Sequence, residues 1–240
     1  GSKNIHENVS IGDILAISYP RNNFQLLRNS THTIFLAAGI GITPILSMVK
    51  TLKTMQLSYE LHYFVRSEHY GAFEGDLSKL NKPPKTYSNL SVAETLGAIK
   101  KILRTPNTTT YVYVCGPSAF IKSTIEIGKK YGWGESRIKY EYFKNYKKVN
   151  RKAQFTIELA RSALTLNVPS GKTILEVLRE NKINIESSCE QGACGSCKAT
   201  VLGGKIEHQD VYLNSEEKDK EDTILTCVSR AKSGRLILDL

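Results

Sequence analysis

The sequence predicts two consecutive domains, a doubly wound parallel-sheet α/β domain followed by a smaller α+β domain. Residues 29–143 alternate strand-like and helix-like segments, the pattern of a parallel sheet with helices on both faces. Residues 153–240 start with two alternating strands, a short helix and then further extended segments. Residues 144–152 contain almost no apolar side chains and are expected to link the two domains. A chain of 240 residues is long enough for this division.

The first domain is expected to bind a ligand at the carboxyl ends of its strands, as doubly wound sheets do. Its strands are predicted at residues 33–38, 58–65, 110–114 and 137–143. Its helices are predicted at residues 44–54, 92–103 and 119–131.

The second domain is expected to open with a hairpin of strands 154–160 and 164–168, followed by a helix at 173–180. A strand at 198–202, a turn at Gly203 and Gly204, a segment at 223–229 that carries a further cysteine, and a closing strand at 236–240 complete it.

Cysteine spacing in the second domain predicts an iron–sulfur cluster. Three cysteines form a C-x4-C-x2-C pattern and a fourth follows at a distance: Cys189, Cys194, Cys197 and Cys227. Plant-type ferredoxins hold a [2Fe–2S] cluster through four thiolates with this spacing. Gly192 and Gly195 let the backbone pass close to such a cluster. We therefore expect the four cysteines to be its ligands and the chain to carry single electrons.

A structural zinc site and a disulfide pair are the alternatives for these cysteines. Zinc sites usually combine two separated C-x2-C units or include histidines, whereas the nearest histidine here is His208. Disulfides are disfavoured because the sequence opens with no apolar signal segment and the cysteines crowd into one loop.

Two strand ends of the first domain suggest a nucleotide site. At the first, Gly39 and Gly41 allow the backbone to approach a pyrophosphate. Thr43 is expected to cap the following helix, and Pro44 suits its first turn. An ordinary strand-to-helix turn explains this motif equally well by itself. A second strand end, V-C-G-P at residues 114–117, favours the nucleotide.

Together these motifs resemble a known family. G-I-G-I-T-P at 39–44 and Y-V-C-G-P-S-A-F at 113–120, with Y-E-Y-F at 140–143, are similar to the nicotinamide-binding domain of the ferredoxin–NADP⁺ reductase superfamily. A ferredoxin-like domain placed after it resembles the phthalate dioxygenase reductase and vanillate demethylase reductase group. The resemblance implies an NAD(P)H-binding domain at 29–143 and a β-grasp, plant-type ferredoxin domain at 153–240.

Residues 1–28 resemble the C-terminal part of that group's FMN-binding β-barrel. The matching features are G-D at 12–13 and the run Y-P-R-N-N-F at 19–24. The group's R-x-Y-S motif for FMN does not occur in the sequence, and 28 residues cannot close a barrel of six strands of about 5–6 residues each. Most of the flavin domain is therefore expected to be missing, and this fragment alone is not expected to complete the reaction.

The function that the resemblance implies is electron transfer from NADH through FMN to the [2Fe–2S] cluster and on to a Rieske-type oxygenase component. A flavin must stand between, because hydride delivers an electron pair and the cluster accepts one electron. Carnitine monooxygenase reductases are among the group's relatives. The alternative is a redox-sensing or ferredoxin-type carrier module that does not oxidise NADH itself.

The resemblance also assigns residues around the nicotinamide. Cys115, Gly116 and Pro117 would border it, with Cys115 shaping the environment for hydride transfer rather than attacking as a nucleophile. A buried small apolar side chain is the other interpretation of Cys115. Phe143 would lie near the flavin and the nicotinamide, although its position in the sequence suits a core residue equally well.

The choice of nucleotide depends on Arg66 and Ser67 at the end of the second strand. An arginine there suits the 2′-phosphate of NADPH on chemical grounds. The resembled group mostly uses NADH with a similar Arg-Ser pair, so NADH is expected and NADPH is possible.

Charge differs between the two halves of the chain. Residues 1–152 carry 22 Lys and Arg against 10 Asp and Glu, whereas residues 153–240 carry 11 against 13. The positive charge of the first half favours an anionic ligand there. The second half is expected to steer a partner electrostatically, through a loop around Glu186 and Glu190. The sequence predicts no nucleic-acid partner, no membrane span and a cytoplasmic location.

Overall fold

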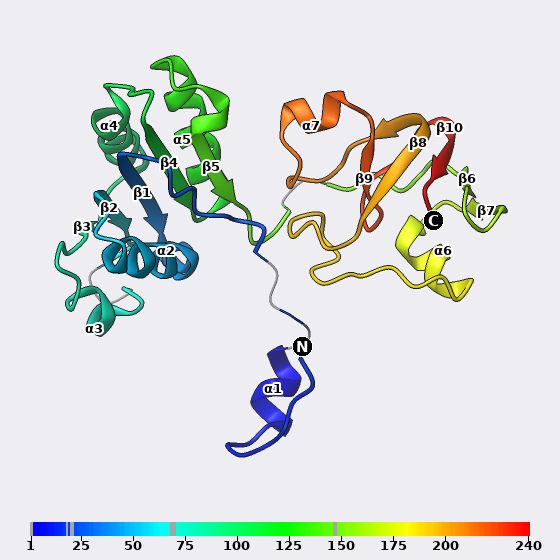
Figure 1. Cartoon of the computed structure of the whole chain (residues 1–240), viewed down its shortest axis with the longest axis horizontal. Helices are drawn as coiled ribbons and strands as arrows, with labels where there is room; N and C mark the ends of the chain where they lie inside the picture. Colours follow the sequence, from blue (N-terminus) through cyan, green and yellow to red (C-terminus); the bar gives the residue numbers. More distant parts are fainter. Residues whose placement is uncertain (1, 18, 20–21, 68–70, 146–147) are drawn as a thin grey trace.

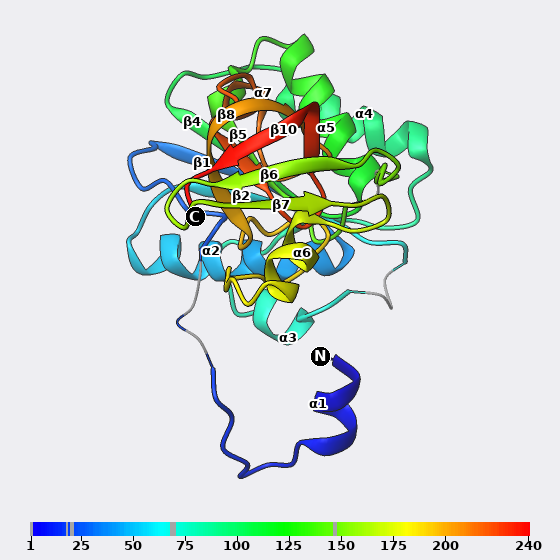
Figure 2. The same cartoon turned by 90° about the vertical axis from the view of Figure 1, so that its right-hand side faces the viewer.

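Two five-stranded sheets organise the chain. The computed structural model describes residues 2–17, 19, 22–67, 71–145 and 148–240. Four residues of the expected barrel tail (Gly1, Ser18, Pro20 and Arg21) and two of the expected linker (Tyr146 and Lys147) lie outside this part. Figures 1 and 2 show the two sheets in separate bodies, with the short helix α1 (Ser2–Asn8) apart from both.

The first sheet is parallel throughout, with strand order β3-β2-β1-β4-β5. Its strands are β1 (His32–Ala38), β2 (Tyr59–Phe64), β3 (Lys85–Tyr87), β4 (Thr110–Cys115) and β5 (Ile138–Glu141). The helices of this body are η1 (Gly39–Gly41), α2 (Ile42–Thr54), α3 (Glu74–Leu77), α4 (Val92–Leu103), α5 (Ser118–Lys130) and η3 (Glu135–Arg137).

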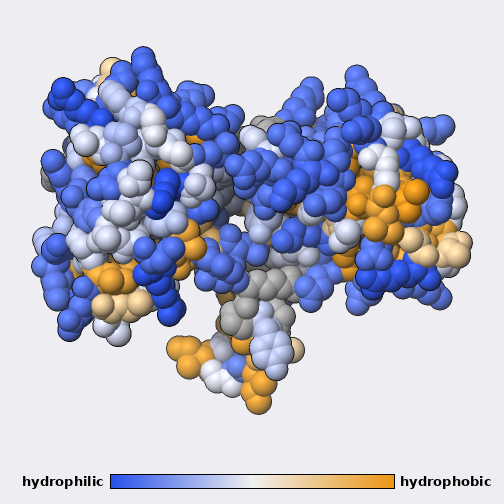
Figure 3. All heavy atoms as spheres, turned by 45° about the horizontal axis from the view of Figure 1, so that its top comes forward, coloured by the Kyte–Doolittle hydropathy of each residue, from blue (hydrophilic) through white to orange (hydrophobic). Residues whose placement is uncertain are grey.

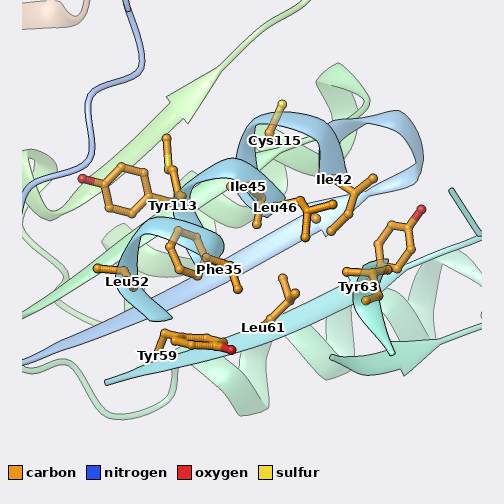
Figure 4. Packing of buried hydrophobic residues seen from close by; sticks show 14 of the residues in the cluster. Phe35, Ile42, Ile45, Leu46, Leu52, Tyr59, Leu61, Tyr63, Tyr113 and Cys115 are labelled. Carbon is orange, nitrogen blue, oxygen red and sulfur yellow. The ribbon is translucent and has the colours of Figure 1, made fainter. Parts of the chain in front are cut away.

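Alternation along the central strand explains why helices cover both faces. Side chains of a strand point to opposite faces in turn, and every residue of β1 after His32 is buried. Phe35 and Ala37 pack with residues of α2, as Figure 4 shows for Phe35. Ile34 and Leu36 pack with residues of α4 and α5. The expected doubly wound architecture is confirmed.

The second sheet has the order β7-β6-β10-β8-β9. Its strands are β6 (Phe155–Leu159), β7 (Leu164–Val168), β8 (Lys198–Glu207), β9 (Thr223–Leu225) and β10 (Arg230–Leu238). The pairing of β6 with β10 is parallel and the others are antiparallel. Helix α6 (Ile174–Glu180) packs its apolar side chains into the core of this sheet, and a shorter helix, α7 (Ser215–Asp219), lies between β8 and β9 in the chain.

A buried arginine joins three segments of the second body. Arg230 is 1 % exposed, and its guanidinium stacks over the ring of Phe155 at 4.8 Å. It donates hydrogen bonds to the carbonyl oxygens of Lys172 (2.7 Å) and Ala153, and a longer one to that of Pro169 (3.4 Å). A charge that is fully desolvated is stable only with such partners, so Arg230 fixes the start of the domain onto its core.

Several elements differ from the sequence prediction. Gly203 and Gly204 do not form a turn, because β8 continues through them to Glu207. Gly204 has φ of +99° where the pairing of β8 with β10 is irregular, so these glycines mark a bulge inside a strand. The closing strand is longer than expected and begins at Arg230.

The remaining differences concern short elements and one helix start. Strand β3 and helices α1, α3 and α7 were not anticipated, because three to seven residues show too little periodicity to be recognised. Helix α2 begins at Ile42 with Gly41 as its N-cap, so the expectation that Thr43 caps it is wrong. The Thr43 hydroxyl instead donates to the carbonyl oxygen of Ile40 at 2.9 Å.

Candidate functional site

A cavity of about 590 Å³ lies at the carboxyl ends of β1, β2 and β4. Sequence-predicted residues that line it are Gly39, Gly41, Arg66, Gly116, Pro117 and Phe143. These residues come from four separate segments, and the topology of the parallel sheet brings their strand ends to one edge. The structure therefore assembles most of the predicted nucleotide site.

The two glycines of the first strand end are needed for different reasons. Gly39 has φ of +53°, a backbone conformation that side chains disfavour, although a Cβ there would meet nothing within 4 Å. Gly41 has an ordinary φ of −63°, but a Cβ would lie 2.3 Å from the carbonyl oxygen of Cys115 and 2.6 Å from the amide nitrogen of Gly116. The loops after β1 and β4 are thus in backbone contact at the edge of the cavity.

The other predicted residues do not line this cavity. Cys115 is fully buried and packs within the cluster between the sheet and α2, as Figure 4 shows. Burial, with a contribution from the charge of Glu141, raises the pKa of its thiol to about 12, so it remains protonated at neutral pH. Pro44 lines a different cavity beside α2. Thr43 and Ser67 lie near the loops but line none of the cavities described for this region.

Aromatic residues that the sequence analysis missed form one wall of the cavity. Phe64 stacks on Tyr87, with ring centroids 4.4 Å apart and planes 6° apart, and it also contacts Phe120 at 5.1 Å. The signal in the sequence was an aromatic residue at the last position of β2 and again of β3. Such a wall provides a flat apolar surface for a ring system. Phe143 is 47 % exposed at the same cavity, so it is not a core residue.

The four predicted cluster ligands gather at one end of the second sheet. Three lie in the loop before β8, and Cys227 lies two residues after the end of β9, whose pairing with β8 brings it back to that loop. The carbonyl oxygen of Cys197 accepts bonds from the amide (3.1 Å) and hydroxyl (3.0 Å) of Thr226. Cys197 and Cys227 are buried, and Cys189 and Cys194 are partly exposed.

Three residues in the left-handed region of the backbone shape the loop. Glu190, Gly192 and Gly195 have φ of +51°, +70° and +75°. A Cβ at Gly192 would lie 2.5 Å from the side chain of Val228, and one at Gly195 would lie 2.4 Å from the ring of Tyr212. The glycines predicted from the motif therefore sit where the loop is both left-handed and closely packed.

Local hydrogen bonds favour thiolates in this loop. The amides of Cys189 and Gln191 donate to the sulfurs of Cys194 and Cys189 at 3.4 Å each. Burial acts to raise the pKa of Cys194, but hydrogen bonds with Ser196 and the amide of Cys189 outweigh it and lower that pKa. The hydrogen bond between Cys197 and Cys227 lowers the pKa of Cys197 and raises that of Cys227, because the two thiols share a proton.

These donors suit an iron–sulfur cluster. Four cysteines without a disulfide provide the soft anionic ligands that two ferric ions need, and Gly192 and Gly195 let the backbone between them turn tightly. Within the described residues no group of three or more His, Cys, Asp or Glu side chains is arranged around a single ion. A [2Fe–2S] cluster distributes its four thiolates over two irons, two to each.

A small cavity of about 150 Å³ separates the cysteine loop, residues 189–197, from the first body. On one side it is lined by Asn23 and by residues 140–142 at the end of β5, and on the other by Ala193 of the loop and Tyr212. The Asn23 side-chain amide donates a hydrogen bond to the carbonyl oxygen of Cys194. The cysteine loop therefore faces the first body.

Comparison with known proteins finds matches to both halves of the chain. The family model described as a 2Fe-2S iron-sulfur cluster binding domain matches residues 157–232. The vanillate O-demethylase oxidoreductase of Acinetobacter baylyi is 36 % identical, over all of this chain and 76 % of its own length. The phthalate 4,5-dioxygenase oxygenase reductase subunit of Pseudomonas putida is 35 % identical, over all of this chain and 74 % of its own length.

The chain belongs to the phthalate dioxygenase reductase family. The solved structure of phthalate dioxygenase reductase, titled as a modular structure for electron transfer from pyridine nucleotides to [2Fe–2S], aligns with the whole chain at a TM-score of 0.65 and 33 % identity, and the chain covers 75 % of it. An intact type IV self-sufficient cytochrome P450 monooxygenase aligns at a TM-score of 0.82 and 30 % identity, and the chain covers 31 % of it.

Reductases of this family are oxidoreductases that use NADH and FMN and contain a [2Fe–2S] ferredoxin domain. The expected family and fold class are thereby confirmed. The chain spans only 41 % of oxidoreductase NdmD of Pseudomonas putida, to which it is 37 % identical, so the reductase module also occurs within longer proteins. No helix among the described residues has both the length and the apolar composition to cross a membrane.

Proposed function

We propose that this chain binds NADH and carries the [2Fe–2S] cluster in a reductase that passes electrons from NADH through FMN to the cluster and on to a Rieske-type oxygenase component. The observation that carries this proposal is the position of the cysteine loop. It faces the nucleotide-binding body across a cavity lined by residues of both, at the edge of the sheet where β5 ends.

The cluster ligands in this proposal are the four cysteines of the motif, Cys189, Cys194, Cys197 and Cys227. Gly192 and Gly195 give the loop its left-handed backbone, and the N–H group of Gln191 donates to the sulfur of Cys189. Such N–H···S bonds stabilise the charge on a thiolate and tune the potential of what it binds.

Nucleotide binding is assigned to the cavity at the strand ends. Gly39 and Gly41 would let the pyrophosphate lie against the start of α2, whose free N–H groups and dipole favour an anion. Gly116, Pro117 and Phe143 would border the nicotinamide. Buried Cys115 acts there as part of the wall behind the loop and takes no part as a nucleophile, because its thiol remains neutral.

Arg66 is exposed at the rim of the same cavity, and its carbonyl oxygen accepts from the amide of Asn89 at 3.2 Å. An exposed guanidinium pairs with adenosine or phosphate oxygens without requiring a 2′-phosphate. We therefore propose NADH as the donor, in keeping with the nucleotide of the family.

Bound FMN would supply the change from a two-electron hydride donor to two single-electron transfers, which the [2Fe–2S] cluster would carry one at a time. The residues of this chain position the nucleotide and the cluster for that chemistry. The glycine loops position NADH at the end of β1, and the cysteine loop positions the cluster beside β5. Tyr212 packs over Gly195 and shields the loop from water on the side of the cavity.

The N-terminal segment supports the proposed flavin domain. Ile11, Ile14 and Ile17 are 88 % or more exposed, and Figure 3 shows apolar side chains on the segment that extends away from the two bodies. Exposed aliphatic residues in such a run indicate a surface that packs against further structure. We propose that residues 1–28 form part of a flavin barrel in the complete reductase.

The oxygenase is proposed to approach the exposed side of the cysteine loop. Relatives at 35 % identity are named as the reductase subunits of phthalate dioxygenase and of carnitine monooxygenase. Glu190 in this loop is not a free charge, since its carboxylate accepts from Arg179 at 2.6 Å and from Ser187 at 3.0 Å. Glu186 is the other acidic group of this surface. A cytoplasmic location is proposed because thiolate ligands persist in a reducing compartment.

Reconstitution of the cluster in this chain tests the ligand assignment. The native chain and Cys115→Ala should show the visible absorbance of a [2Fe–2S] centre and, after dithionite reduction, a rhombic EPR signal. Cys227→Ser should lose most of both. A cluster that survives Cys227→Ser but not Cys115→Ala would contradict the assignment.

Anaerobic titration of the flavin-loaded reductase that contains this chain tests the electron path. NADH should bleach the flavin and then reduce the cluster, and NADPH should do so less effectively at equal concentration. If the cluster forms but neither nucleotide reduces it through a flavin, the proposed reductase function is wrong and the result supports a sensory or carrier module instead.

A further inference from the structure

The segment before the first sheet is fixed onto the nucleotide-binding body. Phe24 is 7 % exposed and belongs to the core cluster on the α2 side, with its ring 5.5 Å from that of Tyr113. The Tyr113 hydroxyl accepts from the amide of Leu27 at 2.7 Å and donates to the carbonyl oxygen of Gln25 at 3.0 Å. Tyr113 lies in β4, two residues before Cys115, so β4 holds this segment in a defined position.

Asn23 connects this anchored segment to the second body. Its side-chain amide donates to the carbonyl oxygen of Cys194, across a sequence separation of 171 residues. The adjacent Gly195 is in the left-handed region and is packed under the ring of Tyr212, so the carbonyl that Asn23 contacts belongs to a rigid part of the loop. A continuous series of contacts therefore runs from β4 to the backbone of a proposed cluster ligand.

A second connection lies on the linker side of the loop. Gln209 is 7 % exposed, and its side-chain amide accepts from the N–H group of Asn150 and donates to the carbonyl oxygen of Asn150. The main-chain carbonyl oxygen of Gln209 accepts from the side-chain amide of Asn145 at 2.8 Å. Two residues further on, the amide of Val211 donates to the carbonyl oxygen of Gly192 at 3.0 Å. The linker thus holds one side of the cysteine loop, and Asn23 holds the side that faces the first body.

We propose that Asn23 is a positioning residue for electron transfer: it holds the cluster loop against the nucleotide-binding body and so sets the distance between the flavin and the cluster. This inference rests on the proposed function. Electron transfer between two centres slows steeply as their separation grows, so a single bond that selects the docked arrangement affects that step. Hydride transfer from NADH depends on the flavin and the first body, and it should not respond.

Three variants of Asn23 in the flavin-loaded reductase test the inference by anaerobic stopped-flow spectroscopy. Asn23→Ala should slow cluster reduction about fivefold, the shift in docked population expected from losing one ordinary hydrogen bond, while flavin reduction by NADH keeps its rate. Asn23→Asp should be slower still, because a carboxylate cannot donate and repels the carbonyl oxygen. Asn23→Gln keeps the donor and should recover part of the rate.

Hydrogen exchange provides a readout that does not depend on turnover. In the cluster-reconstituted chain, amides of residues 189–197 should exchange faster in Asn23→Ala than in the native chain, with the EPR signal of the cluster unchanged. Asn181→Ala is the matched control, since the Asn181 amide also donates to a carbonyl oxygen, that of Val177 at 2.9 Å, but within its own helix. It should alter neither the exchange of the loop nor the rate of cluster reduction.

The outcomes separate this inference from the function on which it rests. Unchanged cluster reduction and unchanged exchange in Asn23→Ala would overturn the positioning role. An equal slowing of flavin reduction and cluster reduction would also overturn it, because Asn23 would then act on the flavin itself. Failure of NADH to reduce the native reductase would instead refute the proposed function.

Discussion

Replacement of Gly41 by alanine should separate the loops that form the nucleotide cavity. The new Cβ would lie 2.3 Å from the carbonyl oxygen of Cys115, which is 1.1 Å short of the 3.4 Å at which ordinary contacts begin. All three atoms that it meets are backbone atoms of Cys115 and Gly116, so no side chain can turn away to relieve the clash. The loop after β1 or the loop after β4 must move by roughly the missing distance.

The cost of that movement can be bounded. Overpacking a closely packed site costs about 1–3 kcal/mol. Since Gly41 has φ of −63°, none of this arises from backbone strain at the residue itself. Gly39→Ala should differ in origin, because its φ of +53° costs an alanine about 1–2 kcal/mol although no atom lies within 4 Å. If opening the cavity relieves about 1.4 kcal/mol of the strain in Gly41→Ala, the affinity of that variant for NADH should fall about tenfold or more.

Urea denaturation of the chain measures the stability change, and calorimetric titration with NADH measures the affinity. Gly97→Ala is the control, because Gly97 lies inside α4 with open space at its Cβ position, and alanine there should stabilise the protein by about 0.5–1 kcal/mol. If Gly41→Ala keeps both the native unfolding free energy and the native affinity, the contact between the two loops does not shape the site.

Three further predictions concern the second domain and the core. Arg230→Ala should destabilise the second domain by about 2–4 kcal/mol in urea denaturation, because it leaves buried carbonyl oxygens without their donor; a change near zero would show that water replaces the guanidinium. Thr173→Ala should cost about 1 kcal/mol by removing the N-cap of α6. The carboxylate of Glu176 has a pKa lowered mainly by the backbone hydrogen bond from Thr173, so this stabilisation is present above the ordinary carboxyl pKa and is lost as pH falls through the lowered value; the stability of Glu176→Gln, which has no carboxylate to titrate, should therefore fall less in acid than that of the native chain. In the cluster-free chain at pH 8, iodoacetamide followed by mass spectrometry should find Cys189 and Cys194 modified before Cys115, whose pKa burial raises to about 12; early modification of Cys115 would contradict its place in the core.

Much of the fold could be predicted from the sequence, because the patterns that specify its helices and strands lie within short stretches of the chain. The C-x4-C-x2-C spacing is a covalent property of the chain, and the apolar strand of residues 33–38 needs both faces covered wherever it lies. The expected helices of the first domain agree with α2, α4 and α5 to within two residues. Gly203 and Gly204 show the limit, because two glycines predict a turn locally, while pairing with β10 makes them a bulge in β8.

Sequence alone determined the cysteine motif and the two glycine-containing strand ends, because residue type and spacing are enough to recognise both. Only the tertiary structure decided that Gly41 touches the backbone of Cys115, that Phe64, Tyr87 and Phe120 form one wall, and that Asn23 reaches Cys194. Each of these contacts joins residues 23 or more positions apart, and their meeting depends on how the sheets and helices pack. Local patterns specify which elements form, and burial of their apolar faces against each other specifies which of their polar ends come together.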